Sequence, residues 1–143
     1  MTKLIYSPWL AAYLIVLQMF LMMTVGFYRT KKMQGTGFQA DDLTLERLIR
    51  RHGNLAENAG IFIASITLLE LVSGSTNLVL GLCVAFALAR TFHAIGFSSL
   101  AGSHLVNAKG LGLFFLLTRA LGAGLTALSG VVCGFALAIA MAR

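Results

Sequence analysis

Charged residues are scarce in this sequence. Asp, Glu, Lys and Arg make up 11% of its 143 residues, whereas a soluble domain contains roughly 25%. Hydrophobic residues make up 58%, and the mean hydropathy is +0.86. Proline is nearly absent, with one residue against 15 glycines, and membrane-spanning helices tolerate glycine better than soluble helices do. The composition excludes an ordinary soluble domain and predicts an all-α integral membrane protein.

Acidic residues are rarer still, with five against eleven basic ones and a net charge of +6. A basic excess can indicate nucleic-acid binding. Here, however, the basic residues stand at the ends of apolar runs, where they determine orientation in a bilayer. We therefore expect no nucleic-acid partner.

Several common catalytic motifs are also missing. The sequence has no G-x-G-x-x-G, no Walker loop, no Cys-x-x-Cys and no Ser-His-Asp set in a plausible order. His52, His93 and His104 lack the i,i+4 spacing of a helical zinc pair, so we expect no metal. Cys83 and Cys133 lie inside apolar runs, which is typical of small packing residues.

What the sequence does contain is four segments long enough to cross a bilayer, which takes about 20 residues. The second is fully apolar only over 59–69, which is too short to span alone, so its polar first half must belong to the same helix. The four segments predict a four-helix bundle forming a single membrane domain over residues 1–143. Whether residues 111–118 extend the last helix or lie at the membrane interface is open. The expected spans are about 8–28, 43–72, 78–97 and 119–142.

The basic residues gather at one end of these spans. The other end offers only Lys3 and Arg143. The positive-inside rule then predicts a multi-pass protein whose first and third loops face the cytoplasm. The basic residues of these loops and the adjoining helix starts are Arg29, Lys31, Lys32, Arg47, Arg50, Arg51, Lys109 and Arg119.

Small residues recur every four positions along the last apolar segment. This spacing lets helix backbones approach closely in lipid, so it predicts close packing within or between subunits. The residues concerned are Gly122, Thr126, Gly130, Gly134, Ala138 and Ala142.

The stretch "ERLIRRHGNLAEN" at residues 46–58 runs directly into an apolar segment. Asp41 or Asp42 is the expected N-cap of this helix. Helical spacing places four of its polar residues within an arc of roughly 80°, and two of them form an i,i+4 pair of opposite charge. The four are Glu46, Arg50, Asn54 and Glu57.

In the third segment Arg90, His93 and Phe97 share one helix face. The topology brings these residues, the polar stripe and Arg119 to one membrane surface. Ionisable groups in membrane spans normally face a protein interior or a wet cavity. Because arginines outnumber acids here, we expect a cavity that attracts an anion. The alternatives are arginines that extend to the interface, and a structural ion pair between Glu57 and Arg90.

These residues resemble the motifs of the MAPEG family, the membrane-associated proteins in eicosanoid and glutathione metabolism. The resemblance covers nearly the whole chain. It implies a homotrimer that binds glutathione between adjacent subunits near the cytoplasmic surface. It further implies that Arg50, Asn54, Glu57, Arg90 and His93 bind glutathione and that Arg119 lies near its sulfur as the catalytic residue. The motifs are E-R-x-x-R-x-H-x-N-x-x-E at 46–57, A-R-x-x-H at 89–93 and R-x-x-G at 119–122.

The chemistry of glutathione agrees with this assignment. Arginines suit its two carboxylates and Glu57 suits its ammonium group, while a guanidinium favours the thiolate form of its thiol. The resemblance implies a glutathione-dependent transferase or peroxidase acting on lipophilic substrates from the bilayer. The alternative is a catalytically weak protein of the same fold that binds a lipid or anionic ligand and acts through partners. A transporter is disfavoured, because the charges lie near one surface.

Two positions depart from the pattern of the better-known animal members. Gly53 stands where an arginine is common, and Phe97 where a tyrosine is common. Both departures resemble the bacterial branch of the family. A bacterial inner membrane is therefore favoured over the endoplasmic reticulum.

Overall fold

A computed structural model describes residues 3–37, 41–105 and 109–142, so parts of the two predicted loops and Arg143 lie outside the described residues. These ranges contain five helices and no strand. Four of the helices are long and apolar enough to cross a membrane, as a multi-pass integral membrane protein requires. In chain order the helices are α1 (Tyr6–Lys31), α2 (Leu43–Ser73), α3 (Asn77–Gly96), α4 (Leu100–His104) and α5 (Leu111–Met141).

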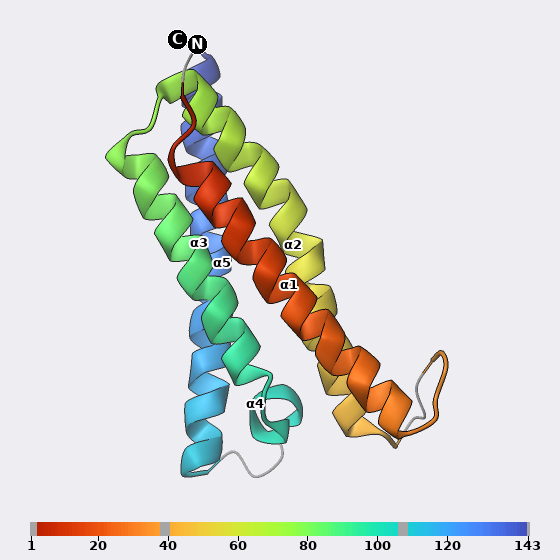
Figure 1. Cartoon of the computed structure of the whole chain (residues 1–143). Coiled ribbons are helices and arrows are strands. Elements are labelled where there is room, and N and C mark those ends of the chain that lie inside the picture. The colour runs from red at the N-terminus through yellow and green to blue at the C-terminus, as the bar shows by residue number, and fades with distance from the viewer. Residues whose placement is uncertain (1–2, 38–40, 106–108, 143) are drawn as a thin grey trace.

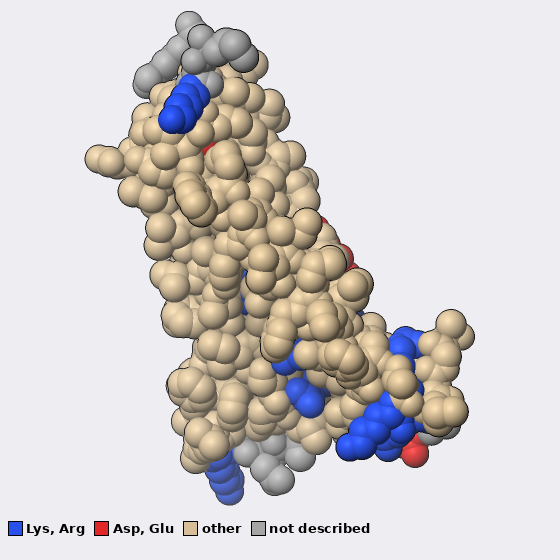
Figure 2. Space-filling model, in the orientation of Figure 1, with Lys and Arg blue, Asp and Glu red and all other residues tan. Residues whose placement is uncertain are grey.

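The helices run between two chemically different ends (Figure 1). One end carries both termini and the α2–α3 turn; the other carries the α1–α2 loop, α4 and the start of α5. Most of the visible lysine and arginine side chains gather at this second end, with a largely uncharged band between the two ends (Figure 2). We call the two ends the terminal end and the basic end.

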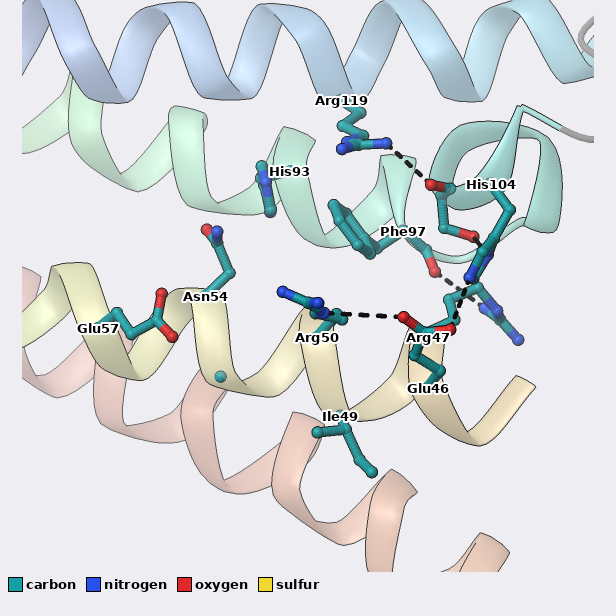
Figure 3. A pocket seen from close by; sticks show the side chains of 12 residues that line it. Glu46, Arg47, Ile49, Arg50, Asn54, Glu57, His93, Phe97, His104 and Arg119 are labelled. Atoms are coloured by element: carbon teal, nitrogen blue, oxygen red, sulfur yellow. Dashed lines mark hydrogen bonds and ion pairs between the residues drawn. The ribbon is translucent and has the colours of Figure 1, made fainter. Parts of the chain in front are cut away.

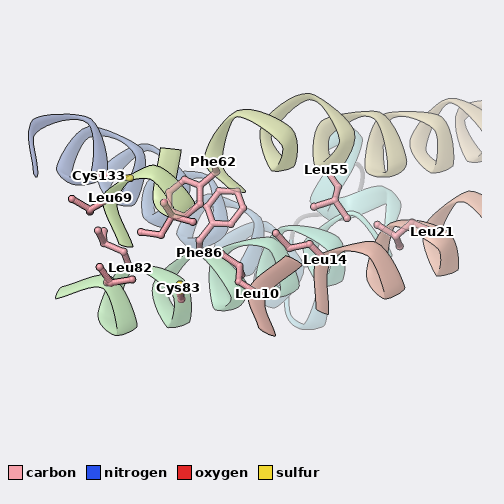
Figure 4. Close-up of a cluster of buried hydrophobic side chains, with 12 residues drawn as sticks. Leu10, Leu14, Leu21, Leu55, Phe62, Leu69, Leu82, Cys83, Phe86 and Cys133 are labelled. Carbon is pink, nitrogen blue, oxygen red and sulfur yellow. The ribbon is translucent and has the colours of Figure 1, made fainter. Parts of the chain in front are cut away.

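An apolar core lies between α1, α2, α3 and α5 (Figure 4). On α2, Leu55, Phe62, Ile66 and Leu69 are buried at spacings of three, four and seven residues, which keeps them on one helix face. The Phe62 ring stacks on Phe86 of α3, with ring centroids 3.7 Å apart. Lipid is as apolar as leucine, so such a core stabilises the bundle through packing contacts. Both cysteines are free and buried in it.

The terminal end is held by the buried carboxylate of Glu70 on α2. The backbone amides of Ile5, Tyr6 and Ser7 each donate to it at 2.8 Å. The hydroxyls of Ser7 and Ser75 donate at 2.5 and 2.6 Å. The first amides of a helix have no partner within the helix, and the helix dipole favours an anion there. Glu70 therefore caps α1 from a neighbouring helix.

At the basic end, Asp42 is the N-cap of α2, as one of the two predicted alternatives had it. Its Oδ1 accepts from the Leu45 amide and from the Tyr28 hydroxyl, both at 3.0 Å. The hydrogen bond from the Leu45 amide is the main cause of a pKa for Asp42 below its ordinary value of 3.8.

The chain between α3 and α5 differs from the expected simple loop. Residues 100–104 form the short helix α4, in which the Ser99 hydroxyl accepts from the Ala101 amide at 3.2 Å. Helix α5 begins at Leu111, after Gly110 with a φ of 53°. The open question about residues 111–118 is thereby answered: they belong to the last helix, which begins before the expected span at 119.

Candidate functional site

A cavity of about 560 Å³ opens at the basic end between α2, α3, α4 and α5 (Figure 3). Polar and ionisable side chains make up most of its lining. The residues are Glu46, Arg47, Ile49, Arg50, Gly53, Asn54, Glu57, His93, Phe97, Ser103, His104 and Arg119.

Three arginines in the first half of α2 have different environments. The Nη1 atom of Arg47 donates to the carbonyl oxygen of Phe97 at 2.9 Å, at the C-terminus of α3. Arg51 is buried and donates to the hydroxyls of Thr24 and Ser98. The side chain of Arg50 is 73% exposed. Arg47 and Arg51 therefore tie α2 to other elements, whereas Arg50 keeps its donors available to the cavity.

The predicted pair of Glu46 and Arg50 is present, with 3.9 Å between Glu46 Oε1 and Arg50 Nε. One turn further, Asn54 points from α2 toward His93 on α3 (Figure 3). Glu57 follows on the same side of α2 and is exposed. Among the described residues Glu57 has no ion pair, so its carboxylate remains able to bind a cation.

Arg90 lies behind the cavity wall. Its guanidinium donates to Asn54 Oδ1 at 2.6 Å and to Thr126 Oγ1 at 3.1 Å. The residue is buried, and it does not line the cavity. The alternative of an ion pair between Arg90 and Glu57 is not realised in this structure. Arg90 instead connects α2, α3 and α5 through Asn54 and Thr126.

His93, Phe97 and Arg119 form a stack across the cavity. The His93 and Phe97 rings have centroids 4.7 Å apart, and the Arg119 guanidinium carbon lies 4.7 Å from the Phe97 ring centre. This second contact has the geometry of a cation–π interaction. His93 is 5% exposed, and its Nδ1 has no hydrogen-bond partner among the described residues. The Phe97 ring therefore contacts both the His93 ring, whose Nδ1 is buried without a partner among the described residues, and the Arg119 guanidinium.

Two glycines bring α3 and α5 close enough to form this stack. A Cβ atom on Gly122 would lie 2.5 Å from the His93 amide nitrogen. One on Gly96 would lie 2.5 Å from the Cβ of Arg119. Any other residue at either position would force the two backbones apart. Of the predicted small-residue ridge, Gly122 packs against α3, whereas Gly130 and Gly134 face open space on the surface of α5.

The cavity also contains residues that the sequence did not single out. Ser103 and His104 line it from α4. His104 Nε2 lies 3.2 Å from Glu46 Oε2, and its Nδ1 lies 2.9 Å from the Ser103 hydroxyl. An expected loop gave no reason to place these two residues at the cavity. The one sequence signal for a helix here is Ser99, which is its N-cap residue.

Of the six predicted site residues, five line the cavity and Arg90 supports it from behind. The sequence model of the MAPEG family matches residues 7–143. The chain belongs to the MAPEG family. Membership supports a membrane function in glutathione or eicosanoid metabolism in general, and an enzymatic activity is in keeping with it. No curated protein and no solved structure matches the chain in the corresponding comparisons.

Proposed function

We propose that this MAPEG protein is a glutathione-dependent transferase or peroxidase that acts on lipophilic electrophiles or hydroperoxides. One observation carries the proposal: Arg50, Glu57 and Arg119 line a single cavity, and each has donors or acceptors without a partner among the described residues. Charged groups at membrane depth are costly unless they meet a partner. Unused capacity of both signs at one place therefore supports a charged ligand that carries both signs.

Glutathione fits this set of charges. It carries two carboxylates and one ammonium group. The exposed guanidinium of Arg50 suits a carboxylate, because its planar array of donors matches the two oxygens. Glu57 suits the ammonium group, and the amide of Asn54 and the ring of His93 add neutral polar contacts. Arg90 would act on the ligand through Asn54, since it does not line the cavity.

Arg119 is the proposed catalytic residue. A guanidinium next to the thiol favours the thiolate, which is the nucleophile, and the thiol proton leaves to water. In conjugation the sulfur bonds to an electrophilic carbon, and the leaving group departs with the electron pair of the broken bond. With a hydroperoxide the sulfur takes the terminal oxygen and the alcohol is released. A second glutathione then converts the sulfenic acid to a disulfide and water.

We further propose that the chain, a single membrane domain, assembles as a homotrimer with the cavity closed by a neighbouring subunit. Glu57 is exposed in the single chain although α2 is a membrane-spanning helix. An exposed carboxylate at the open side of a cavity within a membrane is unfavourable, so a neighbouring subunit that closes the cavity is a better environment for it. The open faces of Gly130 and Gly134 provide a surface for close helix packing. Cross-linking in native membranes tests this, and finding only monomers would contradict it.

The positive-inside rule supports a cytoplasmic position for the basic end. A bacterial inner membrane is the location that the resemblance to the bacterial branch favours.

A catalytically weak ligand-binding protein of the same fold is the second candidate. It is supported by Phe97, which stands beside Arg119 and offers no hydroxyl to the thiol. In that case the cavity would bind a lipid headgroup or another anion, and the protein would act through partners.

Turnover of glutathione separates the two candidates. The protein, purified in detergent, is assayed with glutathione and either 1-chloro-2,4-dinitrobenzene or cumene hydroperoxide. We expect Arg119→Ala to lower kcat by roughly 100- to 1,000-fold, the usual cost of losing a group that stabilises developing charge. Lys3→Ala removes a cation at the terminal end and serves as the matched control. Activity that survives Arg119→Ala contradicts the catalytic role. If glutathione neither binds the wild-type protein nor raises its melting temperature, the result contradicts glutathione as the ligand.

A further inference from the structure

Two backbone carbonyls of α4 hold the guanidinium of Arg119. Its Nη1 atom donates to the carbonyl oxygens of Gly102 at 2.9 Å and Ser103 at 3.1 Å. The last carbonyls of a helix have no partner within the helix, and the helix dipole makes this end negative. Arg119 therefore caps α4. Its Nε and Nη2 atoms have no acceptor among the described residues and remain free to donate.

Helix α4 needs outside contacts to hold this position, because a helix of five residues is not stable alone. One contact is backbone packing: a Cβ atom on Gly102 would overlap the carbonyl oxygen of Gly96, so α4 lies directly against the end of α3. A second contact joins α4 to α2. It is the hydrogen bond between His104 Nε2 and Glu46 Oε2, 3.2 Å long. In the described part of the chain, no other side-chain hydrogen bond joins these two helices.

The direction of this hydrogen bond follows from the chemistry of its partners. An ionised carboxylate can only accept, so the Nε2–H of His104 donates this hydrogen bond to Glu46 Oε2. The other ring nitrogen, Nδ1, lies 2.9 Å from the Ser103 hydroxyl oxygen, which also lies 3.0 Å from the carbonyl oxygen of Ser99. Both ring nitrogens therefore have a polar neighbour. The opposite oxygen of Glu46 faces Arg50, so Glu46 serves both the α4 contact and the cavity.

We propose that His104 is a positioning residue for Arg119. By tying α4 to Glu46, it keeps the Gly102 and Ser103 carbonyls against Arg119, and the guanidinium then presents Nε and Nη2 to the sulfur of the ligand. This role rests on the proposed glutathione function. The tie between α4 and α2 can nevertheless be measured without glutathione.

The test compares His104→Ala, His104→Gln and the matched control His52→Ala. Gln retains a side-chain N–H that can donate to Glu46. His52 lies on α2 but does not line the cavity. Three quantities are measured: kcat and KM for glutathione, the ultraviolet absorbance of the bound thiolate, and the hydrogen-exchange rate of the α4 amides without ligand.

We expect His104→Ala to lower kcat about 10- to 100-fold, the range for a catalytic group displaced by about an ångström. KM should change less than kcat, because Arg50 and Glu57 keep their positions. The thiolate absorbance should fall and exchange should accelerate in α4 alone. His104→Gln should recover most of these losses, and His52→Ala should resemble the wild type.

Unchanged kcat and thiolate absorbance in an active His104→Ala variant would overturn the proposal. So would faster exchange in every helix, since that is the result of general destabilisation. If the wild type does not use glutathione, the proposed function is wrong. The hydrogen-exchange rate of the α4 amides in His104→Ala then tests by itself whether His104 ties α4 to α2. Acceleration confined to α4 supports the tie, whereas unchanged exchange overturns it.

Discussion

The two ends of this molecule both place charged groups within helices that span the membrane, but they use them differently. At the terminal end the Glu70 carboxylate accepts from five donors and is fully buried. At the basic end Arg50, Glu57 and Arg119 line a cavity, and each retains donors or acceptors with no partner in the part of the chain that the structure describes. A buried charge whose hydrogen bonds are complete stabilises the fold. A charged group whose donors or acceptors have no partner indicates a ligand-binding site.

The largest effect on stability should come from removing the Glu70 carboxylate, whose hydrogen bonds are complete. Glu70→Ala leaves the first amides of α1 without an acceptor, and each unsatisfied buried donor costs about 1–3 kcal/mol. We expect a large fall in the melting temperature in detergent, or failure to fold. Glu57→Ala is the matched control, since its carboxylate has no ion pair among the described residues. Equal losses of stability from the two substitutions would contradict the distinction between the ends.

A somewhat smaller effect should come from separating α3 and α5. Gly122→Ala places a Cβ atom 2.5 Å from the His93 amide nitrogen, and overpacking of this kind costs about 1–3 kcal/mol. Because this contact sets the spacing of α3 and α5, which carry His93 and Arg119, glutathione binding should weaken along with thermal stability. Gly81→Ala, where the new Cβ meets nothing within 4 Å, should leave both unchanged. Normal binding by Gly122→Ala would mean that the close approach does not position the site.

Two adjacent arginines sharpen the comparison within a single helix. Arg50→Ala should weaken glutathione binding by about 10- to 100-fold, the loss of a charged hydrogen bond of about 1.5–3 kcal/mol, with little change in melting temperature. Arg51→Ala should lower the melting temperature instead, because it removes contacts with Thr24 and Ser98. Isothermal titration and thermal unfolding of both variants provide the measurement. The reverse pattern would mean that exposure does not distinguish ligand-binding from structural arginines here.

The smallest effect should be the pH dependence of the α2 cap. The pKa of Asp42 is lowered below 3.8 in the folded protein, chiefly by the Leu45 amide. Its ionised form therefore adds stability above its unfolded pKa, and this is lost as pH falls through the folded value. We expect the melting-temperature difference between wild type and Asp42→Asn to shrink below about pH 4. A difference that stays constant across this range would show that the charge of Asp42 does not contribute.

Much of the fold could be predicted, because it rests on local patterns. Length and hydropathy give four apolar helices, and the spacing of Glu46 and Arg50 gives their i,i+4 pair. Helix α4 could not be predicted in this way: it has five residues, and its packing on Gly96 and its hydrogen bond to Glu46 join positions far apart in sequence.

The candidate site could likewise be predicted in part. Its residue types and its position at one membrane surface follow from sequence and topology. The prediction that Arg90 contacts glutathione stays a prediction, and its hydrogen bonds with Asn54 and Thr126 assign it a supporting position. The proposed ligand contacts await the binding measurements above.

The sequence by itself determined the number of membrane-crossing helices, the end of the bundle at which charge gathers and the family to which the chain belongs. It could do so because hydropathy, helical periodicity and motif spacing are properties of neighbouring residues. Only the tertiary structure decided which charged groups are fully hydrogen-bonded. Glu70 accepts from amides more than sixty residues away, whereas among the described residues Arg50 has only its ion pair with Glu46 on the same helix. That difference depends on which helices pack together, and a hydrogen bond exists only where packing brings donor and acceptor within reach.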